Sequence, residues 1–85
     1  MKNFSYKTHG TCSTTINFCL DDNNCIHNLK FIGGCNGNLQ GISHLVEGEP
    51  ASKVLQRCAG ICCGMRPTSC PDQLSQALKL ALNKF

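Results

Sequence analysis

Eight of the 85 residues in this chain are cysteines, and that density leaves two classes of small protein open. Such a chain is either stapled by disulfides, as many secreted domains are, or keeps reduced thiols for metal or redox chemistry. A domain of this length has a marginal core, so a metal ion or disulfides would add useful stability. The positions of the cysteines therefore constrain both the fold and the function.

Several features favour the reduced class. Residues 1–10 (MKNFSYKTHG) lack the apolar segment and cleavage site of a signal peptide. Apolar residues recur at strand and helix periods, which a loop-rich disulfide fold does not need. We therefore expect a reduced cytoplasmic protein, with a disulfide framework as the less favoured alternative.

Charge and hydropathy exclude two kinds of partner. No apolar run approaches the ~20 residues that a membrane span requires, so we expect no membrane association. The net charge of +3 comes from eight basic and five acidic residues. The basic residues are scattered and do not alternate with aromatic residues, which disfavours nucleic-acid binding.

Three segments in the first third of the chain alternate apolar and polar residues, the period of a strand with one buried face. Their apolar residues are Phe4 and Tyr6, then Ile16, Phe18 and Leu20, then Leu29 and Phe31. Residues 21–24 favour a turn, because Asp and Asn side chains bond their own backbone and tolerate left-handed geometry. These segments predict an antiparallel sheet of about three strands.

Three groups of apolar residues at helical spacing follow: Leu39, Ile42, Leu45 and Val46; Val54, Leu55 and Cys58; and Leu74, Ala77, Leu78, Ala81 and Phe85. Asn38 is a suitable N-cap for the first predicted helix, and Gly48 a suitable end. Pro50 suits the first turn of the second helix, which ends at Gly60.

The last helix has the most clearly marked start. Ser69 is the predicted N-cap, Pro71 falls in the first turn, and Asp72 stands where its charge suits the helix dipole. Strands followed by helices predict a single α+β domain over residues 1–85. Its three helices would pack on one face of the N-terminal sheet.

Four cysteines fall at the ends of predicted loops. Cys35 precedes one helix and Cys70 opens the last, and unpaired backbone N–H groups at such positions favour a thiolate. Cys12 lies in the loop that enters the first strand of the hairpin. Cys63 lies in the loop that leads to the last helix. Loop ends from separate segments can assemble one site.

The other cysteines have weaker indications of function. Cys58 is expected to be a buried small hydrophobe, Cys19 to be half exposed, and Cys25 to lie beside the hairpin turn. Cys62 adjoins Cys63, and either could be a ligand. There is no Cys-x-x-Cys knuckle, so the pattern leaves a metal site, a redox thiol pair and inert core thiols all open.

Other catalytic arrangements are poorly supported. His9, His27 and His44 are well separated along the chain and are expected to be solvated or paired polar residues. Asp72 is read as a helix-start residue and not as an acid catalyst. Neither a Ser/His/Asp arrangement nor paired carboxylates indicate hydrolysis.

Residues 68–74, Thr-Ser-Cys-Pro-Asp-Gln-Leu, resemble the TSCPD domain family, which is named for that pentapeptide. The resemblance covers nearly the whole chain and includes residues 10–13, 31–48, 60–61 and 63–64. It identifies as the family's cysteines Cys12, Cys35, Cys63 and Cys70.

A similar domain lies at the C-terminal end of adenosylcobalamin-dependent (class II) ribonucleotide reductases. A chain of 85 residues is too short for the radical barrel and cobalamin site of such an enzyme. The resemblance therefore implies a module that is non-catalytic on its own. The alternative is an accessory or redox-relay component of ribonucleoside-diphosphate reduction, with a ribonucleotide reductase or an iron–sulfur or redox protein as partner.

A second resemblance is to iron–sulfur cluster scaffolds of the NifU N-terminal type, whose three ligands Cys12, Cys35 and Cys70 match in order. Thr14 stands where the scaffolds have an acidic residue, and Ser69 replaces a histidine. The basic chaperone-recognition stretch is absent. The resemblance implies a similar fold, whereas these departures argue against cluster transfer.

Together these observations predict one thiolate site. Four cysteine ligands would close a tetrahedral zinc site, with an iron–sulfur cluster as the alternative because thiolates suit both. Cys62 is an additional thiol beside this site. The predicted metal ligands are Cys12, Cys35, Cys63 and Cys70.

Overall fold

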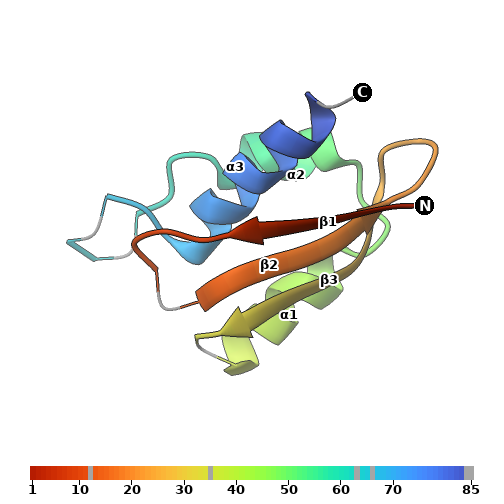
Figure 1. The fold of residues 1–85 in the computed structure, drawn as a ribbon. Coiled ribbons are helices and arrows are strands. Elements are labelled where there is room, and N and C mark those ends of the chain that lie inside the picture. Colours follow the sequence, from red (N-terminus) through yellow and green to blue (C-terminus); the bar gives the residue numbers. More distant parts are fainter. Residues whose placement is uncertain (12, 35, 63, 66, 84–85) are drawn as a thin grey trace.

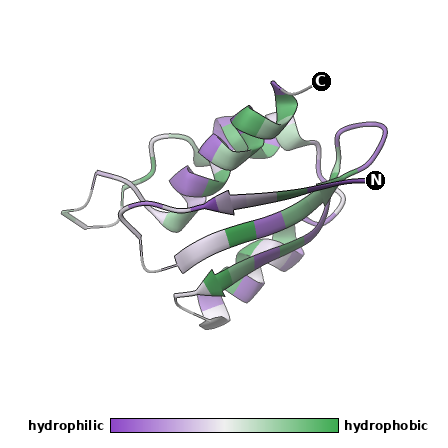
Figure 2. Cartoon of the chain, in the orientation of Figure 1, coloured by the Kyte–Doolittle hydropathy of each residue, from purple (hydrophilic) through white to green (hydrophobic). Residues whose placement is uncertain are grey.

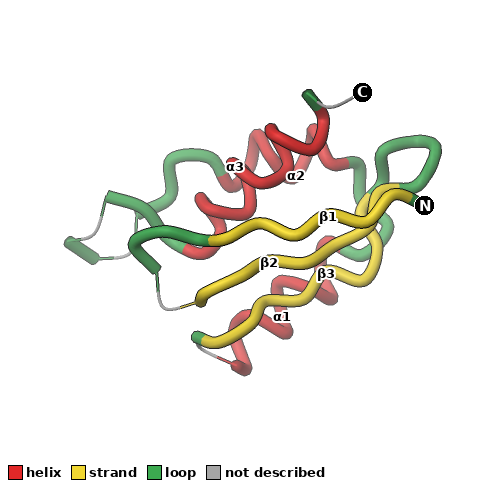
Figure 3. The backbone as a smooth tube through the Cα atoms, in the orientation of Figure 1, coloured by secondary structure: helices red, strands yellow, loops and turns green. Residues whose placement is uncertain are grey.

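The structure is a computed structural model that describes residues 1–11, 13–34, 36–62, 64–65 and 67–83. Within these residues a three-stranded antiparallel sheet of order β1-β2-β3 is followed by three helices. The helices cover one face of the sheet (Figures 1 and 3). This arrangement confirms the predicted α+β class. The elements are β1 (Lys2–Lys7), β2 (Ser13–Leu20), β3 (Ile26–Gly33), α1 (Asn36–Val46), α2 (Ala51–Cys58) and α3 (Cys70–Leu82).

The central strand β2 follows the predicted alternation. Ile16, Phe18 and Leu20 are buried against the helices, while the residues between them are only partly covered. Hydrophobic and hydrophilic bands alternate along this strand (Figure 2). Phe4 of β1 lies opposite Phe18, and their stacked rings are 5.3 Å apart at the centroids. Such a cross-strand aromatic pair contributes up to about 1 kcal/mol beyond its burial.

The turn between β2 and β3 is closed by Asp21, as its composition predicts. Its Oδ1 atom accepts hydrogen bonds from the backbone N–H groups of Asn23 and Cys25, at 2.9 and 3.0 Å. A bulge then interrupts β3 at Asn28, which has a φ of 56°. Because the bulge adds one residue, Ile26 and Leu29 both face the core although they are three positions apart.

Helix α3 begins as predicted. The Ser69 hydroxyl accepts a hydrogen bond from the Asp72 N–H at 3.1 Å, and Pro71 lies in the first turn. The predicted apolar face is confirmed at Leu74, Ala77, Leu78 and Ala81, all of which are buried. Phe85, also assigned to this face, lies outside the described residues.

Helix α1 differs from the prediction at its start and on its apolar face. It begins at Asn36 and not after Asn38, because Gly33 and Gly34, with φ of 78° and 81°, already turn the chain out of β3. Leu45 was assigned to the apolar face but is 80% exposed. The helix packs along the edge strand β3, where only a narrow stripe of its surface can be covered.

Helix α2 also differs slightly at its start, since Pro50 is the N-cap and not a residue of the first turn. The helix buries Ala51 and Val54 and packs against α3. As predicted, Gly48 and Gly60 occupy left-handed positions just beyond α1 and α2. None of the described helices is both long and apolar enough to cross a membrane.

Candidate functional site

Of the four predicted metal ligands, Cys70 alone belongs to the described part of the chain. Cys12, Cys35 and Cys63 lie outside the described residues. The described part of the predicted site therefore consists of Cys70 and of the residues that flank the other three cysteines in the sequence.

Cys70 is the first residue of α3 and is 8% exposed. Its Sγ atom lies 3.2 Å from the hydroxyl of Ser13, a buried residue at the start of β2. Ser13 in turn pairs with Gly33 at the end of β3. The Cys70 thiol therefore lies next to Ser13, the residue that follows Cys12. The strand partner of Ser13 is Gly33, which stands two residues before Cys35 in the sequence.

The loop before α3 is tied to the same place. The Ser69 hydroxyl donates to the carbonyl of Ile61 at 2.6 Å while it caps the helix. One serine thus joins the start of α3 to the residue two positions before Cys63. We call the described residues that surround this point the Cys70 end of the molecule: Ser13, Gly33, Gly60, Ile61, Thr68, Ser69, Cys70, Asp72 and Gln73.

Asp72 is the main acceptor at the Cys70 end. Its carboxylate accepts hydrogen bonds from the Gly60 N–H at 2.7 Å, from the Thr68 hydroxyl, and from the Gln76 amide at 3.1 Å. The bond from Thr68 does most to lower the pKa of Asp72, followed by the bond from Gly60. Asp72 was predicted as a helix-start residue, and in the structure it also fixes the preceding loop.

Gln73 connects a second loop to α3. This buried side chain donates to the Thr68 hydroxyl at 3.0 Å and accepts from the His9 N–H, also at 3.0 Å. Neither Gln73 nor Thr68 was singled out from the sequence as a functional residue. Their only sequence signal is that they flank the conspicuous Ser-Cys-Pro-Asp run. Together they hold the loop around His9 against the helix that carries Cys70.

Of the remaining described cysteines, Cys62 touches the edge of this network, and within the described part of the chain no hydrogen bond joins Cys19, Cys25 or Cys58 to it. Cys62 is exposed, and its thiol lies 3.6 Å from the carbonyls of Gly60 and Pro67 in its own loop. Cys58 is half-buried against the core, and burial raises the pKa of its thiol. Cys19 and Cys25 are half-exposed, in agreement with their positions beside the open face and the turn.

A second ionisable cluster lies at the opposite end of β2. His27 donates or accepts at both ring nitrogens, each 2.7 Å from a carboxylate oxygen of Asp21 or Glu47. The hydrogen bond to Asp21, and then that to Glu47, raises the pKa of His27. The sequence predicted a solvated or paired histidine, and the structure confirms pairing. Its partners are six and 20 residues away, so no local pattern could identify them.

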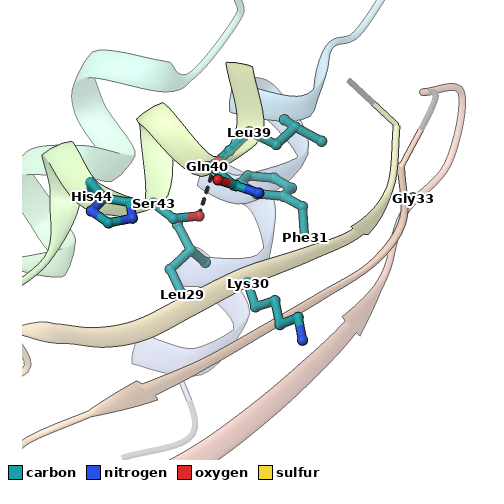
Figure 4. Close-up of a pocket in the computed structure, with 8 residues that line it drawn as sticks. All are labelled: Leu29, Lys30, Phe31, Gly33, Leu39, Gln40, Ser43 and His44. Carbon is teal, nitrogen blue, oxygen red and sulfur yellow. Dashed lines mark hydrogen bonds between the residues drawn. The ribbon is translucent and has the colours of Figure 1, made fainter. Parts of the chain in front are cut away.

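A pocket of about 180 Å³ lies between β3 and α1 (Figure 4). Leu29, Phe31 and Leu39 supply its apolar surface, and His44 lies at its rim. The Lys30 side chain points away from the others. Among the described residues that line this pocket there is neither a thiol nor a carboxylate.

No group of three His, Cys, Asp or Glu side chains that could hold a metal occurs among the described residues. Because three predicted ligands lie outside them, the four-cysteine site stays a prediction. The described part of the chain contributes a buried thiol at a helix N-terminus, which contacts the start of β2, and two neighbouring loops that are bonded to its helix or to the helix cap.

A model of the TSCPD domain family matches residues 2–82, which is nearly the whole chain. The chain belongs to the TSCPD domain family. A search of curated proteins and a search of solved structures found no match. The resemblance to iron–sulfur scaffolds therefore stays a prediction.

The TSCPD pentapeptide, residues 68–72, forms and stabilises the start of α3. Thr68 and Asp72 bond to each other, Ser69 caps the helix, and Pro71 shapes its first turn. Four of the five residues thus build and fasten the start of α3. They present the fifth, Cys70, at a fixed position near the start of β2.

Proposed function

We propose that this TSCPD domain is a metal-binding module whose ligands are Cys12, Cys35, Cys63 and Cys70. The observation that carries the proposal is the contact between Cys70 and Ser13. Ser13 is covalently linked to Cys12 and pairs with Gly33, which stands two residues before Cys35. Adjacent Cα atoms are only 3.8 Å apart, so this spacing supports a shared site for Cys12, Cys35 and Cys70.

The donor set suits a soft or borderline metal. Thiolates bind zinc in closed tetrahedral structural sites, and they also bind iron–sulfur clusters. We favour zinc, because four cysteines would fill its coordination shell and leave no open position for catalysis. A site of this kind would also stabilise a small domain by on the order of 10 kcal/mol. The module would work in the reducing cytoplasm, where thiols stay available.

The buried hydroxyl of Ser13 has a specific role in this proposal. It lies 3.2 Å from Cys70 Sγ, and a hydroxyl at that distance can donate to a thiolate. Hydrogen bonds to ligand atoms outside the coordination shell orient the ligand and tune its basicity. Ser13 and the helix N-terminus would therefore both stabilise the negative charge of Cys70.

Purification without oxygen, followed by elemental analysis and an absorption spectrum, tests the proposal. We expect a colourless protein with about one zinc per chain. A brown protein with visible charge-transfer bands would identify an iron–sulfur cluster in place of zinc. Metal-free protein whose thiols cycle with a thioredoxin system would instead favour the redox-relay function, in association with ribonucleoside-diphosphate reduction.

Two serine variants form a matched pair for the ligand assignment. Cys70→Ser should lose most of the bound metal, because it removes a buried ligand at the start of α3. Cys58→Ser changes a half-buried cysteine on the core side of α2 and should keep its metal. Equal metal content in both variants would contradict the assignment of Cys70.

A further inference from the structure

The imidazole of His27 stands between two carboxylates that come from different elements. Its Nε2 atom is 2.7 Å from Asp21 Oδ2 in the β2–β3 turn, and its Nδ1 atom is 2.7 Å from Glu47 Oε2. Glu47 directly follows the last residue of α1. His27 itself belongs to β3, so one ring joins a turn, a strand and the end of a helix.

This geometry specifies the protonation state of the ring. A neutral imidazole donates from one nitrogen and presents a lone pair at the other, whereas an imidazolium donates from both. An ionised carboxylate only accepts. Two ionised carboxylates at 2.7 Å from opposite nitrogens therefore require the imidazolium, because the neutral ring would set a lone pair against one of them.

Both carboxylates are positioned by the backbone independently of His27. Asp21 uses its Oδ1 atom to accept from the N–H groups of Asn23 and Cys25. Glu47 uses its Oε1 atom to accept from the Asn28 N–H at 2.9 Å. The bond from Cys25 does most to lower the pKa of Asp21, and the bond from Asn28 does most to lower the pKa of Glu47. Each carboxylate thus stays ionised and keeps its second oxygen for His27.

We infer that His27 is a pH-operated clamp: as the imidazolium it holds the β2–β3 turn against the C-terminal end of α1, and loss of its proton releases one of the two contacts. The release is local, because backbone hydrogen bonds still join Ile26 to Gly48 and Glu49 at 2.6 and 2.9 Å. The clamp therefore controls how the turn is held and leaves the attachment of α1 to β3 in place.

Other ionisable groups lie around the clamp. His44, one turn earlier in α1, acts on Glu47 and favours its ionised form. Cys19 of β2 lies opposite His27 in the strand register, and its thiol donates to Asn3. The His27 ring bonds to Asp21 and Glu47, and Cys19 lies opposite it in the strand register. Lys2 and Asp22 line the same surface hollow as Asp21, and Cys25 bonds to Asp21 through its backbone.

An NMR titration of the imidazole ¹⁵N and ¹³C resonances tests the clamp. We expect His27 to titrate above its ordinary value of 6.5, with protons on both nitrogens in the low-pH form. The amide of Asn28, which donates to Glu47, should shift with the same midpoint. A His27 midpoint at or below 6.5, or a ring that is singly protonated in the neutral range, would overturn the inference.

Isosteric variants separate charge from shape. Asp21→Asn and Glu47→Gln keep the side-chain oxygen that accepts from the backbone but lose the charge that favours the imidazolium. Each should lower the His27 midpoint by on the order of one unit. Asp22→Asn, an exposed control in the same turn, should leave the midpoint unchanged. If it moved the midpoint as far as Asp21→Asn did, a general charge effect would replace the clamp.

Discussion

The two ends of this small domain are stabilised in opposite ways. The Cys70 end is bound together by neutral and singly charged hydrogen bonds that join buried side chains of α3 to partly covered loop residues, and the Asp72 carboxylate is their centre. The His27 end is held by three half-exposed ionic groups, the His27 ring and two carboxylates, and the two contacts between them depend on the charge of the ring. Buried networks resist changes in solvent, whereas exposed ion pairs respond to pH and salt. The first end is suited to hold a fixed site, and the second to respond to conditions.

Metal removal should produce the largest difference in stability between the two ends. If Cys70 is a ligand, a chelator should lower the free energy of unfolding at the Cys70 end by on the order of 10 kcal/mol. Hydrogen exchange would then show early loss of protection at Gly60 and Gln73, whose N–H groups bond near the site. The amide of Asn28 should be protected for longer, because its partner Glu47 lies at the other end. A chelator that leaves both ends unchanged would contradict the metal site.

Leu74→Ala is a reference variant, because it changes the hydrophobic core and neither the Cys70 end nor the His27 end. Leu74 is fully buried in the core between the sheet and α3. Its truncation should lower the free energy of unfolding by about 2–5 kcal/mol. Denaturant unfolding followed by circular dichroism measures this loss. The Leu80→Ala change, at a residue 53% exposed on the same helix, should cost far less, and equal losses would contradict the assigned core.

Asp72→Asn should weaken the Cys70 end alone. The amide keeps one acceptor but places an NH₂ group against donors from Gly60, Thr68 or Gln76. A buried donor without an acceptor costs about 1–3 kcal/mol, so we expect a loss of that order in denaturant unfolding. Asp22→Asn, in the exposed turn at the other end, should stay within about 0.5 kcal/mol of the wild type. Similar losses in both variants would show that Asp72 acts as a surface charge.

The sequence predicted what depends on local pattern. The alternation of Ile16, Phe18 and Leu20 gave the buried face of β2, and Ser69 gave the start of α3, because both depend on neighbours within a few residues. Leu45 was misassigned because helical spacing alone does not reveal that α1 lies on an edge strand.

For the candidate site, too, local pattern predicted some features and the fold was needed for others. Cys70 could be selected because it opens a well-marked helix, and its loop-end position agreed with the family pattern. Its contact with Ser13, 57 residues away, required the fold. The His27 partners were equally inaccessible, since a bulge at Asn28 and the end of α1 must both be placed first.

A moderate rise in pH should produce the smallest change and should affect only the His27 end. His27 has a raised folded pKa, so its stabilising contribution is complete below 6.5 and is lost as the pH rises through the folded value. Asp72 has a lowered folded pKa, so its contribution is present above 3.8 and is lost only as the pH falls through the folded value.

Exchange protection factors, which correct for the intrinsic pH dependence of exchange, measure this difference. As the pH rises from 6.5 through the folded pKa of His27, we expect Asn23 and Cys25, which bond to Asp21, to lose protection. Gly60, which bonds to Asp72, should keep its protection over the same range. In Glu47→Gln the loss at the turn should shift to lower pH, because the imidazolium has lost one anionic partner. If Gly60 lost protection together with Asn23, the two ends would be a single cooperative unit and the contrast between them would fail.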